Sequence, residues 1–186
     1  MTQAAPAGYF ESARLAFQPL GPGNEALLHH VFTAAGDYFL PLTGRAEPDA
    51  GAAKHEIEAV TAHASRAIAL VTLLESGEPA GSVGWWLHHP EDDVALLGLL
   101  MLVPELRGQG LAREVVETLV ERFAAAGIRR LRTAVPTTHY AAHDFLRSVG
   151  FTMMSIRDHA AMGVGGTGTL LWERAIGGGE EEGTAG

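Results

Sequence analysis

The chain has 186 residues, a formal net charge of −9 and no cysteine. This length suffices for one domain with a substantial core. The lack of cysteine excludes disulfides, thiolate nucleophiles and cysteine metal sites. The acidic balance disfavours nucleic-acid binding, which needs clustered positive charge. No apolar run approaches the roughly 20 residues of a membrane span, and the N-terminus lacks a secretory signal pattern. We therefore expect a cytoplasmic protein that binds neither nucleic acid nor membranes.

Apolar periodicity predicts alternating strands and helices along most of the chain. Residues 1–12 read as a loose leader, and residues 37–44 as a loop or a short helical turn. The elements expected in order are a strand at 13–20, helices at 25–35 and 52–64, strands at 67–75, 79–87 and 94–103, a helix at 110–126, a strand at 128–135, a helix at 138–148, and strands at 151–157 and 169–175.

The C-terminal residues differ in composition from the rest of the chain. Residues 177–186 consist mainly of Gly and Glu, with almost no apolar side chains. Such a segment cannot bury enough apolar surface to offset the entropy of ordering. We therefore expect a single domain over residues 1–176, followed by a disordered acidic tail over residues 177–186.

The centre of the chain holds a glycine-bearing turn between a predicted strand and a predicted helix. An apolar run at 96–103 precedes the turn, and apolar residues recur after it at helical intervals. The first N–H groups of a helix lack internal partners and lie at the positive end of its dipole. Gly108 and Gly110 remove side chains that would keep a ligand from those donors, while Arg107 and Arg113 add positive charge. The turn therefore predicts a phosphate or pyrophosphate site.

Three phosphate-binding motifs compete for this turn. A Walker loop requires Lys followed by Ser or Thr, a pair that the sequence lacks. A dinucleotide fingerprint requires G-x-G-x-x-G, and Arg113 stands where its third glycine belongs. Arg107, Gly110 and Ala112 instead form R-x-x-G-x-A. This resembles the pyrophosphate signature R/Q-x-x-G-x-G/A of the GNAT acyl-CoA N-acyltransferase superfamily.

The order of the predicted elements extends the resemblance. Across residues 13–175 the expected order is β-α-α-β-β-β-α-β-α-β-β, which matches the GNAT fold, an α/β fold with a mixed sheet. The segment HYAAHDFLRSVGF at residues 139–151 is similar to the family pattern N-x-x-A-x-x-x-Y-x-x-x-G-F. His139 replaces the Asn of that pattern and Leu146 replaces its Tyr, which in many relatives protonates the leaving thiolate.

The resemblance implies an N-acetyltransferase that moves an acetyl group from acetyl-CoA to an amine by direct attack. Acetyl-CoA would be the co-substrate, with its pyrophosphate on the turn and its pantetheine arm paired along the preceding strand. The expected cofactor contacts are Met101, Leu102, Val103, Arg107, Gly108, Gln109, Gly110, Leu111 and Ala112. The acceptor would be a small-molecule or peptide amine whose identity the sequence does not give, and homodimer formation stays open.

The candidate catalytic side chains lie outside the turn. His143 lies three residues before Leu146 on the same helical side and is expected to replace the missing tyrosine as general acid, with Tyr140 as the second choice and water as an alternative. The candidate bases are Asp37, Glu78, His88 and Asp92. No metal site is expected, because no H-E-x-x-H spacing occurs.

Two other classes of function compete with this interpretation. A CoA-binding sensor or interaction module without turnover would also need the turn, and the missing tyrosine slightly favours it. A dinucleotide-binding oxidoreductase is a more distant alternative. Release of free thiol from acetyl-CoA in the presence of amines distinguishes the enzyme from the sensor, and equilibrium binding of NAD tests the oxidoreductase.

Overall fold

The computed structural model describes residues 8–155, 158 and 168–177. The strands are β1 (Phe10–Glu11), β2 (Leu15–Pro19), β3 (Arg66–Leu73), β4 (Pro79–Leu87), β5 (Val94–Leu102), β6 (Arg130–Pro136), β7 (Thr152–Met153) and β8 (Thr169–Ala175). The α-helices are α1 (Glu25–Ala34), α2 (Leu40–Thr43), α3 (Ala52–Ala62), α4 (Leu111–Ala125) and α5 (Tyr140–Ser148). Short 3-10 helices occur at η1 (Gly36–Phe39) and η2 (Pro104–Leu106).

The strands form one eight-stranded sheet in the order β1-β2-β3-β4-β5-β6-β8-β7. All neighbouring strands are antiparallel except β5 and β6, which are parallel. The expected α/β fold with a mixed sheet is therefore confirmed. Strand β1 lies within the segment that was expected to be a loose leader. It was not predicted, because two residues give no alternation to recognise. It pairs with β2 through Phe10 and Phe17, whose rings stack at 4.4 Å.

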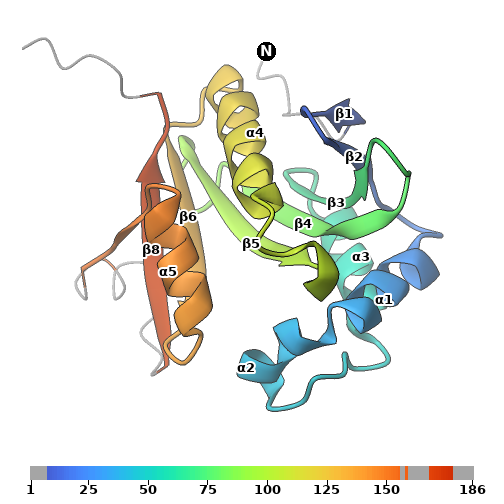
Figure 1. Ribbon diagram of the computed structural model, residues 1–186. Helices are drawn as coiled ribbons and strands as arrows, with labels where there is room; N and C mark the ends of the chain where they lie inside the picture. Colours follow the sequence, from blue (N-terminus) through green and yellow to red (C-terminus); the bar gives the residue numbers. More distant parts are fainter. Residues whose placement is uncertain (1–7, 156–157, 159–167, 178–186) are drawn as a thin grey trace, which may run out of the picture.

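The parallel pair β5–β6 divides the sheet. Pairing begins at Val94 with Arg130 and ends at Leu97 with Thr133, where the Thr133 hydroxyl donates to the Leu97 carbonyl at 2.8 Å. Beyond this pair the strands diverge towards the end of β5 (Figure 1). The cleft-side backbone of the last residues of β5 therefore has no partner in β6.

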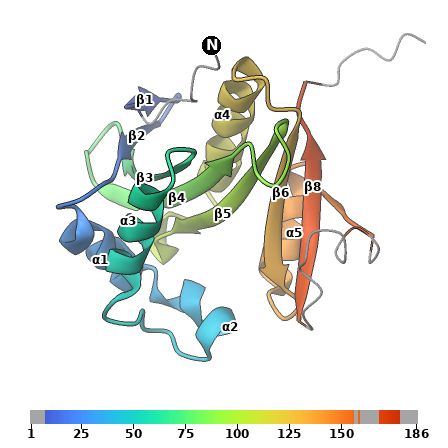
Figure 2. The ribbon, with the colours of Figure 1, turned by 180° about the vertical axis from the view of Figure 1, so that it is seen from behind.

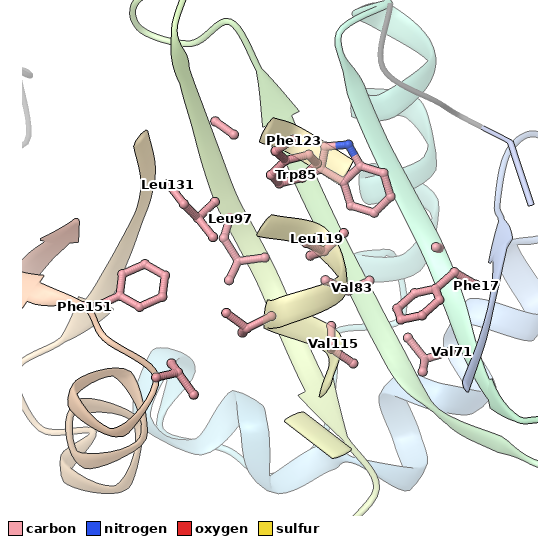
Figure 3. Packing of buried hydrophobic residues seen from close by; sticks show 14 of the residues in the cluster. Phe17, Val71, Val83, Trp85, Leu97, Val115, Leu119, Phe123, Leu131 and Phe151 are labelled. Atoms are coloured by element: carbon pink, nitrogen blue, oxygen red, sulfur yellow. The ribbon is translucent and has the colours of Figure 1, made fainter. Parts of the chain in front are cut away.

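Helices cover both faces of the sheet. Helices α4 and α5 lie on one face, and α1 and α3 lie on the other (Figures 1 and 2). The apolar stripe of α4, including Val115, Leu119 and Phe123, packs against Val83 and Trp85 of β4 (Figure 3). A second apolar cluster fills the space beneath α1 and α3. Removing a fully buried leucine such as Leu119 from a core of this kind costs about 2–5 kcal/mol, so the α4 stripe fixes the helix on the sheet.

Only part of the C-terminal region for which predictions were made lies within the described residues. Of the strand expected at 151–157, the structure has the two-residue strand β7, and residues 156–157 lie outside the described residues. Apart from Gly177, the expected tail also lies outside them. Within the described ranges, no helix is long and apolar enough to cross a membrane.

Candidate active site

A cavity of about 290 Å³ lies where β5 and β6 separate. Its walls come from the C-terminal parts of both strands, the first turns of α5, and the η1–α2 segment. Arg107 and Ala112 of the glycine turn also line it, so the cavity opens onto the predicted anion site. Most of the lining side chains are apolar. The titratable side chains in the described lining are Asp37, Tyr38, Arg107 and His139.

The turn before α4 has a backbone suited to anion binding. Gly108 and Gly110 have φ angles of 75° and 79°, which L side chains rarely adopt. The first helical hydrogen bond runs from the Glu114 N–H to the Gly110 carbonyl. Within the described part of the chain, the N–H groups of residues 108–113 have no acceptor. They lie at the positive end of α4 and are free to bind an anion.

Residues that the motif does not mark hold this turn in place. The Glu114 carboxylate accepts hydrogen bonds from Arg14 Nε at 2.6 Å and from the Ser12 hydroxyl at 2.7 Å. Arg14 Nη1 also donates to the Gln109 carbonyl at 3.1 Å. The connection between β1 and β2 therefore braces the turn. An acidic residue in a first helical turn is common, so the sequence offers no specific signal for this contact.

Arg107 joins the turn to the opposite wall of the cavity. Its Nη2 donates to Asp37 Oδ1 at 2.8 Å, and its Nε and Nη2 donate to the Leu102 carbonyl at 3.0 Å and 2.8 Å. The hydrogen bond from Arg107 holds the pKa of Asp37 below its usual value. The structure therefore brings together the predicted phosphate ligand Arg107 and the predicted base Asp37 as an ion pair.

The other predicted residues of the helix start have different surroundings. Arg113 Nη2 donates to the Ser148 carbonyl at 2.7 Å and so connects α4 to the end of α5. The Leu111 side chain is buried in the core, whereas the Gln109 side-chain amide donates to the Glu105 carbonyl at 3.2 Å. The first turn of α4 therefore offers mainly backbone groups to a ligand.

The predicted pantetheine strand offers its backbone to the cleft at alternate residues only. The Val103 N–H donates to the Ala80 carbonyl at 2.9 Å, so it is not available to a ligand. Successive residues of a strand direct their backbone groups to opposite sides. Leu100 and Leu102 therefore face the cleft, in agreement with the hydrogen bonds from Arg107 to Leu102. The backbone of Met101 faces β4 instead. Its side chain is buried in the core beneath α1 and α3, and the residue is part of the cavity lining.

The structure does not place His143 where a general acid would need to be. Its side chain is buried, Nε2 lies 2.9 Å from the Pro136 carbonyl, and Nδ1 lies 3.1 Å from Trp172 Nε1. The indole N–H can only donate, so Nδ1 accepts and Nε2 carries the proton. Both ring nitrogens are thus engaged in the core. The helical spacing between His143 and Leu146 did not reveal that His143 is buried in the core, because the inward face of α5 contacts both the core and the cavity.

The remaining candidates are not part of the described cavity lining. Tyr140 is 75% exposed. His88 has a φ of 54° in the β4–β5 turn, where its Nδ1 contacts the Asp92 carbonyl. Glu78 lies in the turn between β3 and β4 and is exposed. In the described part of the chain, no group of three or more His, Cys, Asp or Glu side chains could hold a metal.

Tyr38 and His139 line the cavity but were not among the predicted site residues. Burial raises the pKa of Tyr38 to about 12, with a smaller contribution from the charge of Glu56. Burial also lowers the pKa of His139, assisted by nearby His143 and Arg107. A signal for His139 existed in the sequence, because it occupies the first position of the N-x-x-A pattern. No comparable signal existed for Tyr38, which lies in an irregular segment.

Several solved structures resemble this chain. An acetyltransferase from Thermus thermophilus is 28% identical, with a TM-score of 0.73, covering 90% of this chain and 100% of that one. A probable GNAT-family acetyltransferase from Chromobacterium violaceum is 21% identical, with a TM-score of 0.74, covering 94% and 89%. The PaiA N-acetyltransferase from Thermoplasma acidophilum, in complex with coenzyme A, is 11% identical, with a TM-score of 0.62, covering 87% and 99%.

The sequence itself also matches a family model. No curated protein matches the sequence. The model described as "Acetyltransferase (GNAT) family" matches residues 29–151, which include the described cavity lining and the whole glycine turn. Together with the split sheet and the turn before α4, this match shows that the chain belongs to the GNAT family of acetyltransferases.

Proposed function

We propose that this chain binds acetyl-CoA at the glycine turn and transfers its acetyl group to the amine of a small molecule or peptide. The observation that carries the proposal is the run of free N–H groups at residues 108–113 beside the cavity. A pyrophosphate suits these donors, because they combine free hydrogen-bonding groups with the positive end of α4. The use of acetyl-CoA by the family, and the coenzyme A complex of the PaiA enzyme, support the same ligand.

The strand edge is suited to the pantetheine arm. Leu100 and Leu102 direct backbone groups to the cleft, where an amide-bearing ligand can pair with them as an added strand would. The Leu102 carbonyl accepts two hydrogen bonds from Arg107. The Arg107 side chain therefore has to turn away when the ligand pairs with Leu102. The phosphates beside the turn provide a new partner for the guanidinium.

Direct attack by the amine fits the composition of the chain. The sequence has no cysteine, so no thiol is available to carry the acetyl group as a covalent intermediate. We infer that cleft-facing N–H groups of β5 stabilise the thioester oxygen as it gains charge. When Arg107 turns towards phosphate, the Asp37 carboxylate becomes available to attract a cationic amine into the cavity.

Free-thiol release from acetyl-CoA tests this proposal. The purified chain is incubated with acetyl-CoA and a panel of amines that includes spermidine, lysine, other amino acids, a peptide with a free N-terminus and an aminoglycoside. Equilibrium binding of CoA and of NAD is measured in parallel. We expect CoA binding, no NAD binding, and release with at least one amine. CoA binding without release would favour a sensor, and NAD binding without CoA binding would favour an oxidoreductase.

Three broader proposals rest on the sequence alone. We retain a cytoplasmic location, with which the lack of cysteine is compatible. We also retain a single domain over residues 1–176. Homodimer formation is a third proposal, and size-exclusion chromatography with light scattering tests it.

A further inference from the structure

The proposed function leaves open which residue handles the proton of the amine. The residue that many relatives use is replaced by Leu146, which lines the cavity and has no proton to give. His143 is fixed in the core by Pro136 and Trp172. Tyr140 lies outside the described lining and is 75% exposed. The proton must therefore be handled by another side chain of the cavity or by water.

The described cavity wall offers four titratable side chains, and three of them are unsuitable as a proton carrier. Arg107 stays protonated at every physiological pH. The carboxylate of Asp37 has a lowered pKa, so it is a weak base. Tyr38 has a pKa of about 12, and a thiol has a pKa of about 8.5, so transfer from Tyr38 to a thiolate is unfavourable.

His139 differs from these three in geometry and chemistry. It is the N-cap residue of α5 and lies between Pro136 and Ala141, which also line the cavity. Its imidazole has no hydrogen bond to another residue in the described part of the chain, apart from an interaction with its own backbone. The ionisable groups that influence it are His143 on its own helix and, across the cavity, Arg107 and Asp37. A ring nitrogen of His139 is therefore free to face a substrate.

We propose that His139 is the catalytic residue that carries a proton from the attacking amine to the leaving thiolate. This inference rests on the proposed acetyl transfer. The neutral amine forms the new C–N bond, and the carbonyl electrons move to oxygen. The imidazole accepts one proton from the amine nitrogen. When the carbonyl reforms, the C–S bond breaks, its electron pair leaves with sulfur, and the imidazolium protonates the thiolate. The products are an amide, a free thiol and neutral His139.

Burial suits His139 to both proton transfers. It lowers the pKa of the imidazole, so the neutral form that accepts a proton predominates at neutral pH. The resulting imidazolium is a stronger acid than a thiol, whose pKa is about 8.5, so the second transfer is favourable. The nearby guanidinium of Arg107 acts in the same direction, because a like charge disfavours the imidazolium.

Activity measurements on two variants test the proposal. With the amine found in the thiol-release panel, we expect both His139→Ala and His139→Asn to lower kcat about 10²-fold, with little change in the affinity for CoA. The His139 side chain makes no capping hydrogen bond to α5, and Asn is a favoured N-cap residue, so His139→Asn separates chemistry from folding. The exposed His30 on α1 provides the control His30→Ala, which should have the kcat of the unaltered chain. A folded His139→Asn variant with unaltered kcat would overturn the proposal.

The pH profile and NMR titration provide independent readouts. We expect kcat/KM of the unaltered chain to decrease as the pH is lowered, with a midpoint below pH 6.5. This decrease should be absent in His139→Asn. Titration of the imidazole C–H signal, assigned by its loss in His139→Asn, should give the same midpoint without any substrate. A His139 midpoint at or above 6.5 would contradict the proposal. If the unaltered chain binds CoA but releases no thiol with any amine, the proposed function fails, whereas the titration still tests the environment assigned to His139.

Discussion

The two ends of the cleft depend on different parts of the chain. The turn at residues 107–112 provides backbone N–H groups, positive φ angles and the end of a helix. The segment at residues 139–146, which includes most of α5, provides side chains instead. One of its two histidines faces the cavity and the other is buried in the core. His139 lines the cavity, whereas His143 is buried against Trp172.

This difference shows which kind of site a short motif can identify. A backbone site is encoded by glycines and by the change from strand to helix, and both are visible in sequence. A side-chain site depends on which way each residue of a helix points. Residues 139 and 143 are one helical turn apart and would be expected to share a face. The N-cap residue 139 has non-helical backbone angles, which redirects its side chain.

The largest effect is expected at the buried histidine. His143→Ala leaves the Trp172 indole N–H without its partner. The Pro136 carbonyl loses the hydrogen bond from His143 and keeps the one from the His139 N–H. Burying an unpaired donor costs about 1–3 kcal/mol, so we expect a loss of about 1–3 kcal/mol in the free energy of unfolding. Urea denaturation measures this, with His139→Ala as the matched variant that should lose much less. Equal stability of His143→Ala and the unaltered chain would return His143 to the candidates for general acid.

The next effect is expected at the guanidinium of the turn. Arg107→Ala should weaken CoA binding by about tenfold, or 1.4 kcal/mol, at low ionic strength. The loss should shrink at high salt, because screening reduces the contribution of an exposed charge. Calorimetry at two salt concentrations measures both effects. Arg129→Ala removes the same charge from an exposed position away from the cavity and serves as the control. A loss of CoA affinity equal to that of the control would show that Arg107 does not contribute to the phosphate site.

A smaller effect of opposite sign is expected across the cavity. Asp37→Asn weakens the ion pair that now engages Arg107. An exposed ion pair contributes about 0.2–1 kcal/mol, so CoA should bind up to about fivefold more tightly. The KM of a cationic amine should rise in the same variant, because the cavity loses its carboxylate. Weaker CoA binding by Asp37→Asn would show that the pair helps to build the phosphate site.

The smallest effect is expected at the C-terminus. Deletion of residues 178–186 should leave the Tm and the CoA affinity unchanged, because this sequence has too few apolar side chains to contribute to a core. Differential scanning calorimetry and CoA titration of the truncated chain measure both quantities. A lower Tm or a weaker affinity would show that the tail docks on the domain.

Much of the fold could be predicted from the spacing of apolar residues and from the positions of glycine and proline. The run at 96–103 and the helical intervals after Gly110 gave β5 and α4 within a residue or two. Strand β1 could not be predicted, because its two residues give no alternation to recognise. The divergence of β5 and β6 is likewise a property of the sheet and has no local signal in either strand.

The candidate site could be predicted to a lesser degree. The motif led to Gly108, Gly110 and Arg107, which all lie beside the cavity or at the start of α4. It could not reveal that Arg107 pairs with Asp37, because the two residues lie far apart in sequence and meet only when η1 folds over the cleft. The brace formed by Arg14 was hidden for the same reason.

The most direct test of the anion site compares two glycines of the same helix. Gly110 precedes α4 and Gly127 follows it, with φ angles of 79° and 82°. A Cβ at either position would meet no atom closer than 3.7 Å, so valine introduces similar backbone strain at both. We predict that Gly110→Val weakens CoA binding by more than tenfold, or about 1.4 kcal/mol, whereas Gly127→Val retains the affinity. A folded Gly110→Val variant that binds CoA as tightly as Gly127→Val would contradict a phosphate site at this turn.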